Sequence, residues 1–221
     1  MPFWGGGKAW FAPVLISRQR RFIFVHIFKN AGTSITEALT PFAAGPRQLQ
    51  AHRILKHFHV AFLDPQPLPG HATASEIMAW LGEETFDSYF SFAIVRNPWD
   101  WQVSLYTYML QYPGHFQHEL VKSLGGFDGY LRWRCAPGRF DTQKDFVYSK
   151  EGKLLVDFIG RFERLESDFR TICDRIGIST SLPRLNVSHT KPYRDFYTEE
   201  TAELVRRTFE QDIRLFGYTF E

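Results

Sequence analysis

The sequence predicts an α/β fold in which a central, mainly parallel sheet is flanked by helices. Residues 22–27 are almost all aromatic or β-branched, as in a strand that is covered on both faces. Residues 90–95 alternate large apolar side chains with small ones, which is typical of a second strand. Each stretch continues into a short polar turn and then a helix-compatible segment. This order of elements is the one from which parallel sheets are built.

The chain has 221 residues, which is long enough to bury a substantial core. We expect a single domain over residues 1–221, with residues 1–20 as an N-terminal extension. Residues 114–153 mix aromatic residues with turn formers and are expected to form a lid or an acceptor-side insertion with its own small core. The formal net charge of +2, without a Lys/Arg stripe, argues against a nucleic-acid partner.

The chain lacks the sequence features of an exported or membrane-spanning protein. Cys135 and Cys173 form no metal-ligand pattern and fit a reducing compartment. The N-terminus shows no signal-peptide pattern, and there is no apolar run long enough for a membrane span. We therefore expect a cytoplasmic protein without a membrane span. The oligomeric state is not predicted.

The first polar turn has the composition of an anion site. It reads Lys-Asn-Ala-Gly-Thr-Ser and precedes a helix that is expected to stop at Pro41. A helix N-terminus offers backbone N–H groups and a positive dipole end, and Gly32 lets a ligand approach the backbone. Lys29 adds a full positive charge. The spacing differs from a Walker A loop, and an ordinary strand-to-helix turn remains an alternative.

The second turn places an arginine directly after a strand. Arg96 is followed by Asn97 and Pro98, which are favoured at the cap and the first position of a helix. Ligands in open α/β sheets bind at the carboxyl ends of strands, so Arg96 is a candidate to bind phosphate with two hydrogen bonds. The alternative is a structural ion pair with Asp100 or a nearby Glu.

These two stretches, taken together, resemble the type 2 sulfotransferases, a family that includes heparan sulfate 2-O-sulfotransferase and bacterial relatives. The first is similar to the family segment H-I-P-K-T-A-G-T-S, and the second to F-x-F-V-R-N-P-W-D-R-L-V-S. Four further segments match family patterns in order: Ile159–Glu163, Leu182–Asn186, Tyr193–Tyr197 and Asp212–Tyr218. Phe28 and Asn30 depart from the Pro and Thr of the family.

The resemblance implies a P-loop-like three-layer fold and the donor 3′-phosphoadenosine 5′-phosphosulfate, with adenosine 3′,5′-bisphosphate as product. It implies that Lys29, Asn30, Ala31, Gly32, Thr33 and Ser34 hold the 5′-phosphosulfate. Arg96 and Ser104 would hold the 3′-phosphate, and Lys191 and Arg194 are weaker candidates for closing over the nucleotide. An exposed loop before the last helix is the alternative for that last pair. No metal is required.

The chemistry also calls for a general base that removes the proton of the acceptor hydroxyl. His71 is the first candidate because residues 70–74 resemble a family segment, often K-H-x-T-A. His57 and His59 are the rivals, since residues 57–60 resemble the H-G-H-V segment of heparan sulfate 2-O-sulfotransferase. Lys29 is expected to neutralise the leaving group. His26, inside the predicted strand, is expected to be a packed core residue.

Two further helices have clear boundary signals. Thr73 or Ser75 can cap a helix that ends at Gly82, and Thr198 can cap a final helix that runs to Gly217.

The sequence therefore predicts a sulfotransferase that acts on a hydroxyl, with a carbohydrate or glycolipid as the expected acceptor. A nucleotide-dependent small-molecule kinase is the alternative among enzymes. A nucleotide- or glycan-binding module without turnover is the alternative outside them.

Overall fold

The computed structural model describes residues 14–43, 68–183 and 191–221. The chain divides into two compact units, and each is described by itself. The sheet unit contains the described residues up to Val95 together with those from Asp145 to 183. The helical unit contains residues 96–144 and 191–221.

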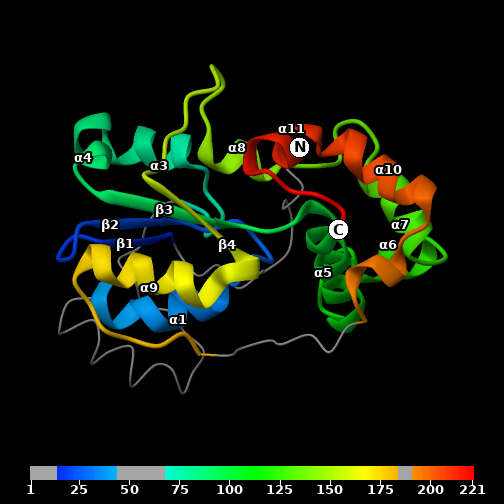
Figure 1. Cartoon of the computed structure of the whole chain (residues 1–221), viewed down its shortest axis with the longest axis horizontal. Coiled ribbons are helices and arrows are strands. Elements are labelled where there is room, and N and C mark those ends of the chain that lie inside the picture. Colours follow the sequence, from blue (N-terminus) through cyan, green and yellow to red (C-terminus); the bar gives the residue numbers. More distant parts are fainter. Residues whose placement is uncertain (1–13, 44–67, 184–190) are drawn as a thin grey trace. The chain divides into compact units, whose positions relative to one another are not determined.

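The sheet unit is built on a four-stranded sheet in the order β1-β2-β3-β4 (Figure 1). The strands are β1 (Leu15–Ser17), β2 (Phe22–Val25), β3 (Phe90–Val95) and β4 (Phe158–Arg161). β1 pairs antiparallel with β2, whereas the pairs β2–β3 and β3–β4 are parallel. Every residue of β2 is buried, as its unbroken apolar pattern predicts.

Helices cover both faces of this sheet. α1 (Gly32–Ala43) and α9 (Leu165–Ile176) lie against one face, and α3 (Ala74–Leu81) and α4 (Glu83–Asp87) lie on the other (Figure 1). The main core cluster joins β2 and β3 to α1 and α9 through buried residues that include Phe24, Phe92 and Ile172. The predicted α/β fold with a mainly parallel, helix-flanked sheet is therefore confirmed.

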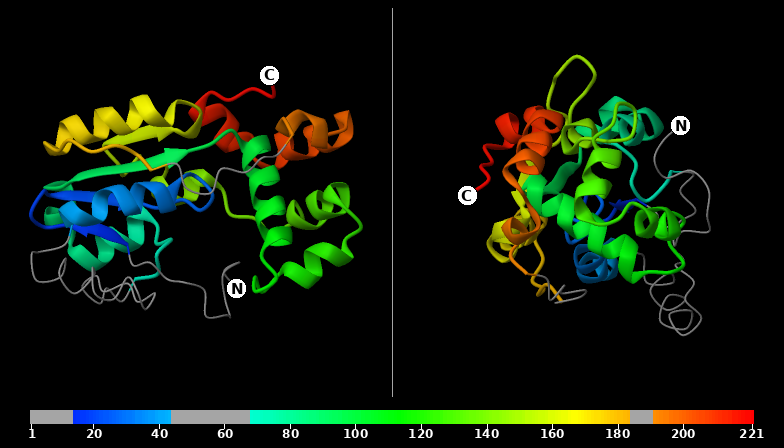
Figure 2. Two further views of the ribbon diagram at one scale, coloured as in Figure 1. Left: turned by 90° about the horizontal axis from the view of Figure 1, so that it is seen from below. Right: turned by 90° about the vertical axis from the view of Figure 1, so that its right-hand side faces the viewer.

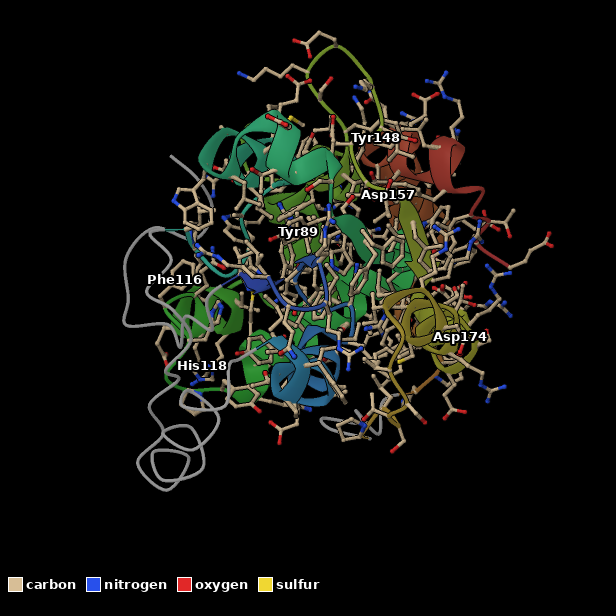
Figure 3. All side chains as sticks on the ribbon, turned by 90° about the vertical axis from the view of Figure 1, so that its left-hand side faces the viewer. Tyr89, Phe116, His118, Tyr148, Asp157 and Asp174 are labelled. Atoms are coloured by element: carbon tan, nitrogen blue, oxygen red, sulfur yellow. The ribbon has the colours of Figure 1, made fainter. Side chains whose placement is uncertain are left out.

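A side chain secures the start of β3. The Ser91 backbone N–H and hydroxyl both donate to the Asp157 carboxylate, at 2.8 and 2.9 Å. Asp157 is labelled in Figure 3. This pair ties the beginning of β3 to the segment that leads into β4.

The helical unit packs together α5 (Pro98–Gln111), α6 (His118–Ser123), α7 (Phe127–Arg134) and α10 (Glu199–Thr208) (Figure 2). Trp101 and Tyr130 are fully buried in its core, and Phe127 packs on Tyr106 and Tyr197. Phe127 and Tyr130, from the segment 114–153, thus pack with aromatic residues of other segments in the core of this unit. The other elements of the described residues are α8 (Gln143–Val147), η2 (Phe162–Arg164), η3 (Tyr193–Phe196) and α11 (Glu210–Phe216).

Three boundaries differ from the sequence-based expectations. Residues 15–17, within the expected N-terminal extension, form the edge strand β1. Pro41 does not stop the first helix but lies inside its last turn, where the helix ends two residues later. The final helix is broken at Phe209, whose ring packs against Trp101 and Phe140 and whose backbone leaves the helical conformation.

The predicted N-terminal caps of two helices, in contrast to these boundaries, are confirmed. Thr73 accepts a hydrogen bond from the Glu76 N–H and forms a capping box, and Asn97 accepts one from the Trp99 N–H. Within the described residues, no helix is long and apolar enough to cross a membrane.

Candidate active site

The loop between β2 and α1 has an unusual backbone. Lys29 and Ala31 both adopt left-handed conformations, with φ values of 64° and 61°. The Ala31 carbonyl then accepts the first hydrogen bond of α1, from the Ile35 N–H at 3.1 Å. Left-handed residues in such turns direct successive N–H groups toward one side and form a concavity that binds anions. This backbone conformation is compatible with an anion site, and the binding of a phosphosulfate by the loop stays a prediction.

Gly32 is required in this loop by a neighbouring side chain. A Cβ added at Gly32 would lie 1.6 Å from His26 Nε2 and 2.1 Å from His26 Cδ2. The His26 ring therefore lies directly over the Gly32 Cα. His26 lies just after β2, which ends at Val25, and its ring stacks on Phe24 of the core and also covers the start of α1.

The first turn of α1 has no acidic side chain to oppose an anion. Ser34 is buried and Thr33 is exposed, so their two hydroxyl groups are in different environments. Asn30 is buried, and its side-chain N donates to the Ile94 carbonyl at 2.9 Å. Asn30 thus anchors the loop to the end of β3, a role that no local sequence pattern indicates.

His71 contacts this same loop. Its Nδ1 lies 3.0 Å from the His26 carbonyl oxygen, and its ring centroid is 4.4 Å from that of His26. The Phe28 ring meets His71 edge-on at 6.0 Å. The structure therefore brings the first candidate base into contact with His26 and Phe28, which lie three residues and one residue before Lys29. His57 and His59 lie outside the described residues.

Both histidines are held in the neutral form. Desolvation lowers the pKa of His71, although its hydrogen bond to the His26 carbonyl acts in the opposite direction. Desolvation, followed by repulsion from His71, lowers the pKa of His26 well below its ordinary value. Because a carbonyl oxygen can only accept a hydrogen bond, Nδ1 of His71 carries the proton. In the neutral ring, Nε2 then has a basic lone pair.

Arg96 lies in the helical unit, directly after β3. It is 8% exposed, and its Nε donates to the Asp100 carboxylate at 2.7 Å. The structural ion pair considered for Arg96 therefore exists. A carboxylate bound at Nε fixes the orientation of the guanidinium plane, so this contact is compatible with phosphate binding through the same group.

The other nucleotide-binding candidates also belong to the helical unit. Ser104 is 9% exposed and lies four residues beyond Asp100, on the same edge of α5 as the Arg96–Asp100 pair. Lys191 and Arg194 are exposed, and Arg194 Nε donates to the Phe220 carbonyl at 3.3 Å. The contact of these residues and of the Lys29 loop with one donor molecule stays a prediction.

Comparison with known proteins assigns the chain to a family. The model of the Sulfotransferase family matches residues 12–219, so the chain belongs to this family. The resemblance found in the sequence motifs is thereby confirmed. Membership in this family indicates a transferase that moves sulfuryl groups.

The chain is also similar to a protein of Archaeoglobus fulgidus that is described as uncharacterized. The two are 33% identical over 125 residues, which cover 52% of this chain and 96% of the relative. This relative supplies no substrate.

Proposed function

We propose that the protein transfers a sulfuryl group from 3′-phosphoadenosine 5′-phosphosulfate to a hydroxyl of a carbohydrate or glycolipid. The observation that carries this proposal is the β2–α1 loop, in which the left-handed residues Lys29 and Ala31 lead into a helix that begins at the ring-covered Gly32. The family assignment supports sulfuryl transfer, and the identity of the donor and the acceptor class are the parts that we add.

The residues of the loop fit a phosphosulfate group. The N–H groups at the start of α1 and the left-handed turns would hold its oxygens, with the Ser34 and Thr33 hydroxyls as further donors. When bound, the donor supplies an activated sulfuryl group on a phosphate that can leave. Lys29 would neutralise the negative charge that accumulates on that phosphate oxygen. The positive charge thus comes from a side chain and not from a metal ion.

His71 would remove the proton of the acceptor hydroxyl. Its Nδ1–H is committed to the His26 carbonyl, so Nε2 is the nitrogen that can accept a proton. Desolvation lowers the pKa of the ring, which keeps His71 unprotonated at neutral pH. The same hydrogen bond would hold the ring in place during turnover, as a second residue commonly does for a catalytic histidine.

Arg96 and Ser104 would bind the 3′-phosphate, which distinguishes this donor from other adenine nucleotides. A guanidinium binds a phosphate with two charge-assisted hydrogen bonds, and Ser104 lies on the same edge of α5. The acceptor class rests on the similarity to heparan sulfate 2-O-sulfotransferase, and a screen of sugar and glycolipid hydroxyls would test it.

Calorimetric titration tests the donor. Adenosine 3′,5′-bisphosphate is titrated into the protein beside ATP with magnesium, with the Lys29→Ala variant measured under the same conditions. Micromolar binding of the bisphosphate and none of ATP would support the proposal. The reverse preference would favour a kinase. Binding without turnover on any acceptor would favour a nucleotide-binding module.

A further inference from the structure

A buried glutamine, Gln143, holds the backbone of Arg96. Its Oε1 accepts from the Arg96 N–H at 2.8 Å, and its Nε2 donates to the Arg96 carbonyl at 2.7 Å. The pairing of β3 with β4 ends one residue earlier, at Val95. Gln143 thus satisfies both backbone groups of a buried residue that lies just beyond the sheet ladder.

The carboxamide of glutamine is the side chain best suited to this task. It has the same donor and acceptor groups as a peptide unit and can therefore pair with one residue as a neighbouring strand would. A carboxylate could accept from the Arg96 N–H but could not donate to its carbonyl. The hydrogen bonds also fix the backbone from which the Arg96 side chain extends, four residues before its partner Asp100.

Gln143 is itself held by a second buried residue. Asp212 in α11 is fully buried, and its two carboxylate oxygens accept from the Gln143 and Lys144 N–H groups, at 2.8 Å each. These are the first two N–H groups of α8, which have no partner within the helix. A continuous chain of hydrogen bonds therefore runs from Asp212 through Gln143 to Arg96.

We propose that Gln143, anchored by Asp212, is a positioning residue that aims the Arg96 guanidinium at the 3′-phosphate of the donor. The inference rests on the proposed function, because it assumes that Arg96 binds this phosphate. Gln143 does not touch the donor in this scheme. Its contribution should therefore be specific for the group that Arg96 binds and should not alter contacts with the rest of the nucleotide.

The test compares two nucleotides that differ only in the 3′-phosphate: adenosine 3′,5′-bisphosphate and adenosine 5′-monophosphate. Affinities are measured by calorimetry for the wild type, Arg96→Ala, Gln143→Met and Asp212→Asn. Gln143→Met keeps the buried volume and removes both polar atoms, whereas Asp212→Asn leaves Gln143 in place and weakens its anchor. The readout is the ratio of the two affinities, which a general loss of stability does not change.

Asp157→Ala is the matched control. Asp157 also accepts a hydrogen bond from a backbone N–H of β3, that of Ser91, which is near the opposite end of the strand from Arg96. Removing its side chain should lower the melting temperature and leave the affinity ratio of the wild type unchanged.

The wild type should prefer the bisphosphate by about tenfold to a hundredfold, as expected for a charge-assisted pair. Arg96→Ala and Gln143→Met should lose most of this preference, and Asp212→Asn should lose part of it. A normal ratio in Gln143→Met together with a lost ratio in Arg96→Ala would overturn the inference and leave the proposed donor site intact. A wild type without preference would overturn both.

Discussion

The turns that follow β2 and β3 differ in whether their side chains cap the backbone N–H groups of the next helix. At α1, the first turn has no acidic side chain, and the loop before it uses left-handed residues and a glycine. At α5, Asn97 caps the Trp99 N–H, Pro98 has no N–H, and Asp100 adds a carboxylate. The first helix can therefore bind an anion through its backbone. The second helix is capped by its own Asn97 side chain and would contribute through side chains, namely Arg96 before the helix and Ser104 within it.

This difference suggests that the two turns have separate roles in sulfuryl transfer. In the proposed function, backbone N–H groups and Lys29 would surround the place where charge changes during transfer, while Arg96 would bind a phosphate that does not react. Substitutions in the turn after β2 should therefore change turnover, and substitutions in the turn after β3 should change the affinity for the donor. The following predictions test this contrast, from the largest expected effect to the smallest.

Lys29→Ala should have the largest effect. Loss of the charge that stabilises the leaving group should lower kcat by about a hundredfold to a thousandfold. The affinity for adenosine 3′,5′-bisphosphate should fall much less, because the backbone contacts remain. Steady-state kinetics and calorimetry measure the two quantities, with the exposed Lys122→Ala as control. Equal losses in turnover and affinity would contradict the assignment.

His71→Ala should lower kcat by about a hundredfold, the lower range for loss of a general base. The affinity for adenosine 3′,5′-bisphosphate should be unchanged, because His71 acts on the acceptor. Turnover assays at saturating donor concentration measure this effect. Nearly normal activity would move the assignment to His57 or His59.

The pH dependence of the wild type provides a second test of His71. A general base works only when it is unprotonated, and desolvation lowers the pKa of His71. The acidic limb of kcat/KM should therefore lie below about pH 6.5, the ordinary pKa of histidine. A limb at higher pH would indicate a different base, and His71→Ala should remove this limb.

Gly32→Ala should have an intermediate effect. The added Cβ collides with the His26 ring, so the loop or the ring must shift. We expect a loss of about 1–3 kcal/mol in the free energy of unfolding, typical of overpacking. Chemical denaturation measures it. The variant His26→Ala/Gly32→Ala should show a smaller combined loss than the sum of the single variants, and strict additivity would show that the ring is not the obstacle.

Lys191→Ala and Arg194→Ala should have the smallest effects. Both side chains are exposed, and exposed charge pairs contribute little, so the KM for the donor should rise by at most about fivefold. Kinetics at low and high ionic strength measure the change, with the exposed Arg214→Ala as control. A large loss of kcat in either variant would show that these two residues act on turnover, as we expect of the turn that follows β2.

Local signals in the sequence were sufficient for much of the fold. The buried strand β2 and the caps Thr73 and Asn97 depend on neighbouring residues, and the structure confirms them. The edge strand β1 has only three residues, and it exists because it pairs with β2. The break at Phe209 likewise depends on rings from distant segments, which no local pattern reveals.

The candidate site likewise combines features that the local sequence predicts with contacts between distant residues that it does not predict. The composition of residues 29–34 points to an anion site, because a helix N-terminus and a glycine act locally. The contact of His26 with Gly32 and His71, and the pairing of Gln143 with Arg96, join residues far apart in the chain. A histidine or glutamine alone carries no signal for such contacts, since both residue types occur in many surroundings.

The left-handed backbone at Lys29 and Ala31 has a consequence for protein engineering. Residues with a Cβ lose roughly 1–2 kcal/mol in this conformation. A laboratory selection for heat resistance alone would therefore favour glycine or asparagine at both positions and would discard the lysine. Thermostable variants should be sought with position 29 held constant and glycine introduced only at position 31, where no ammonium group is lost.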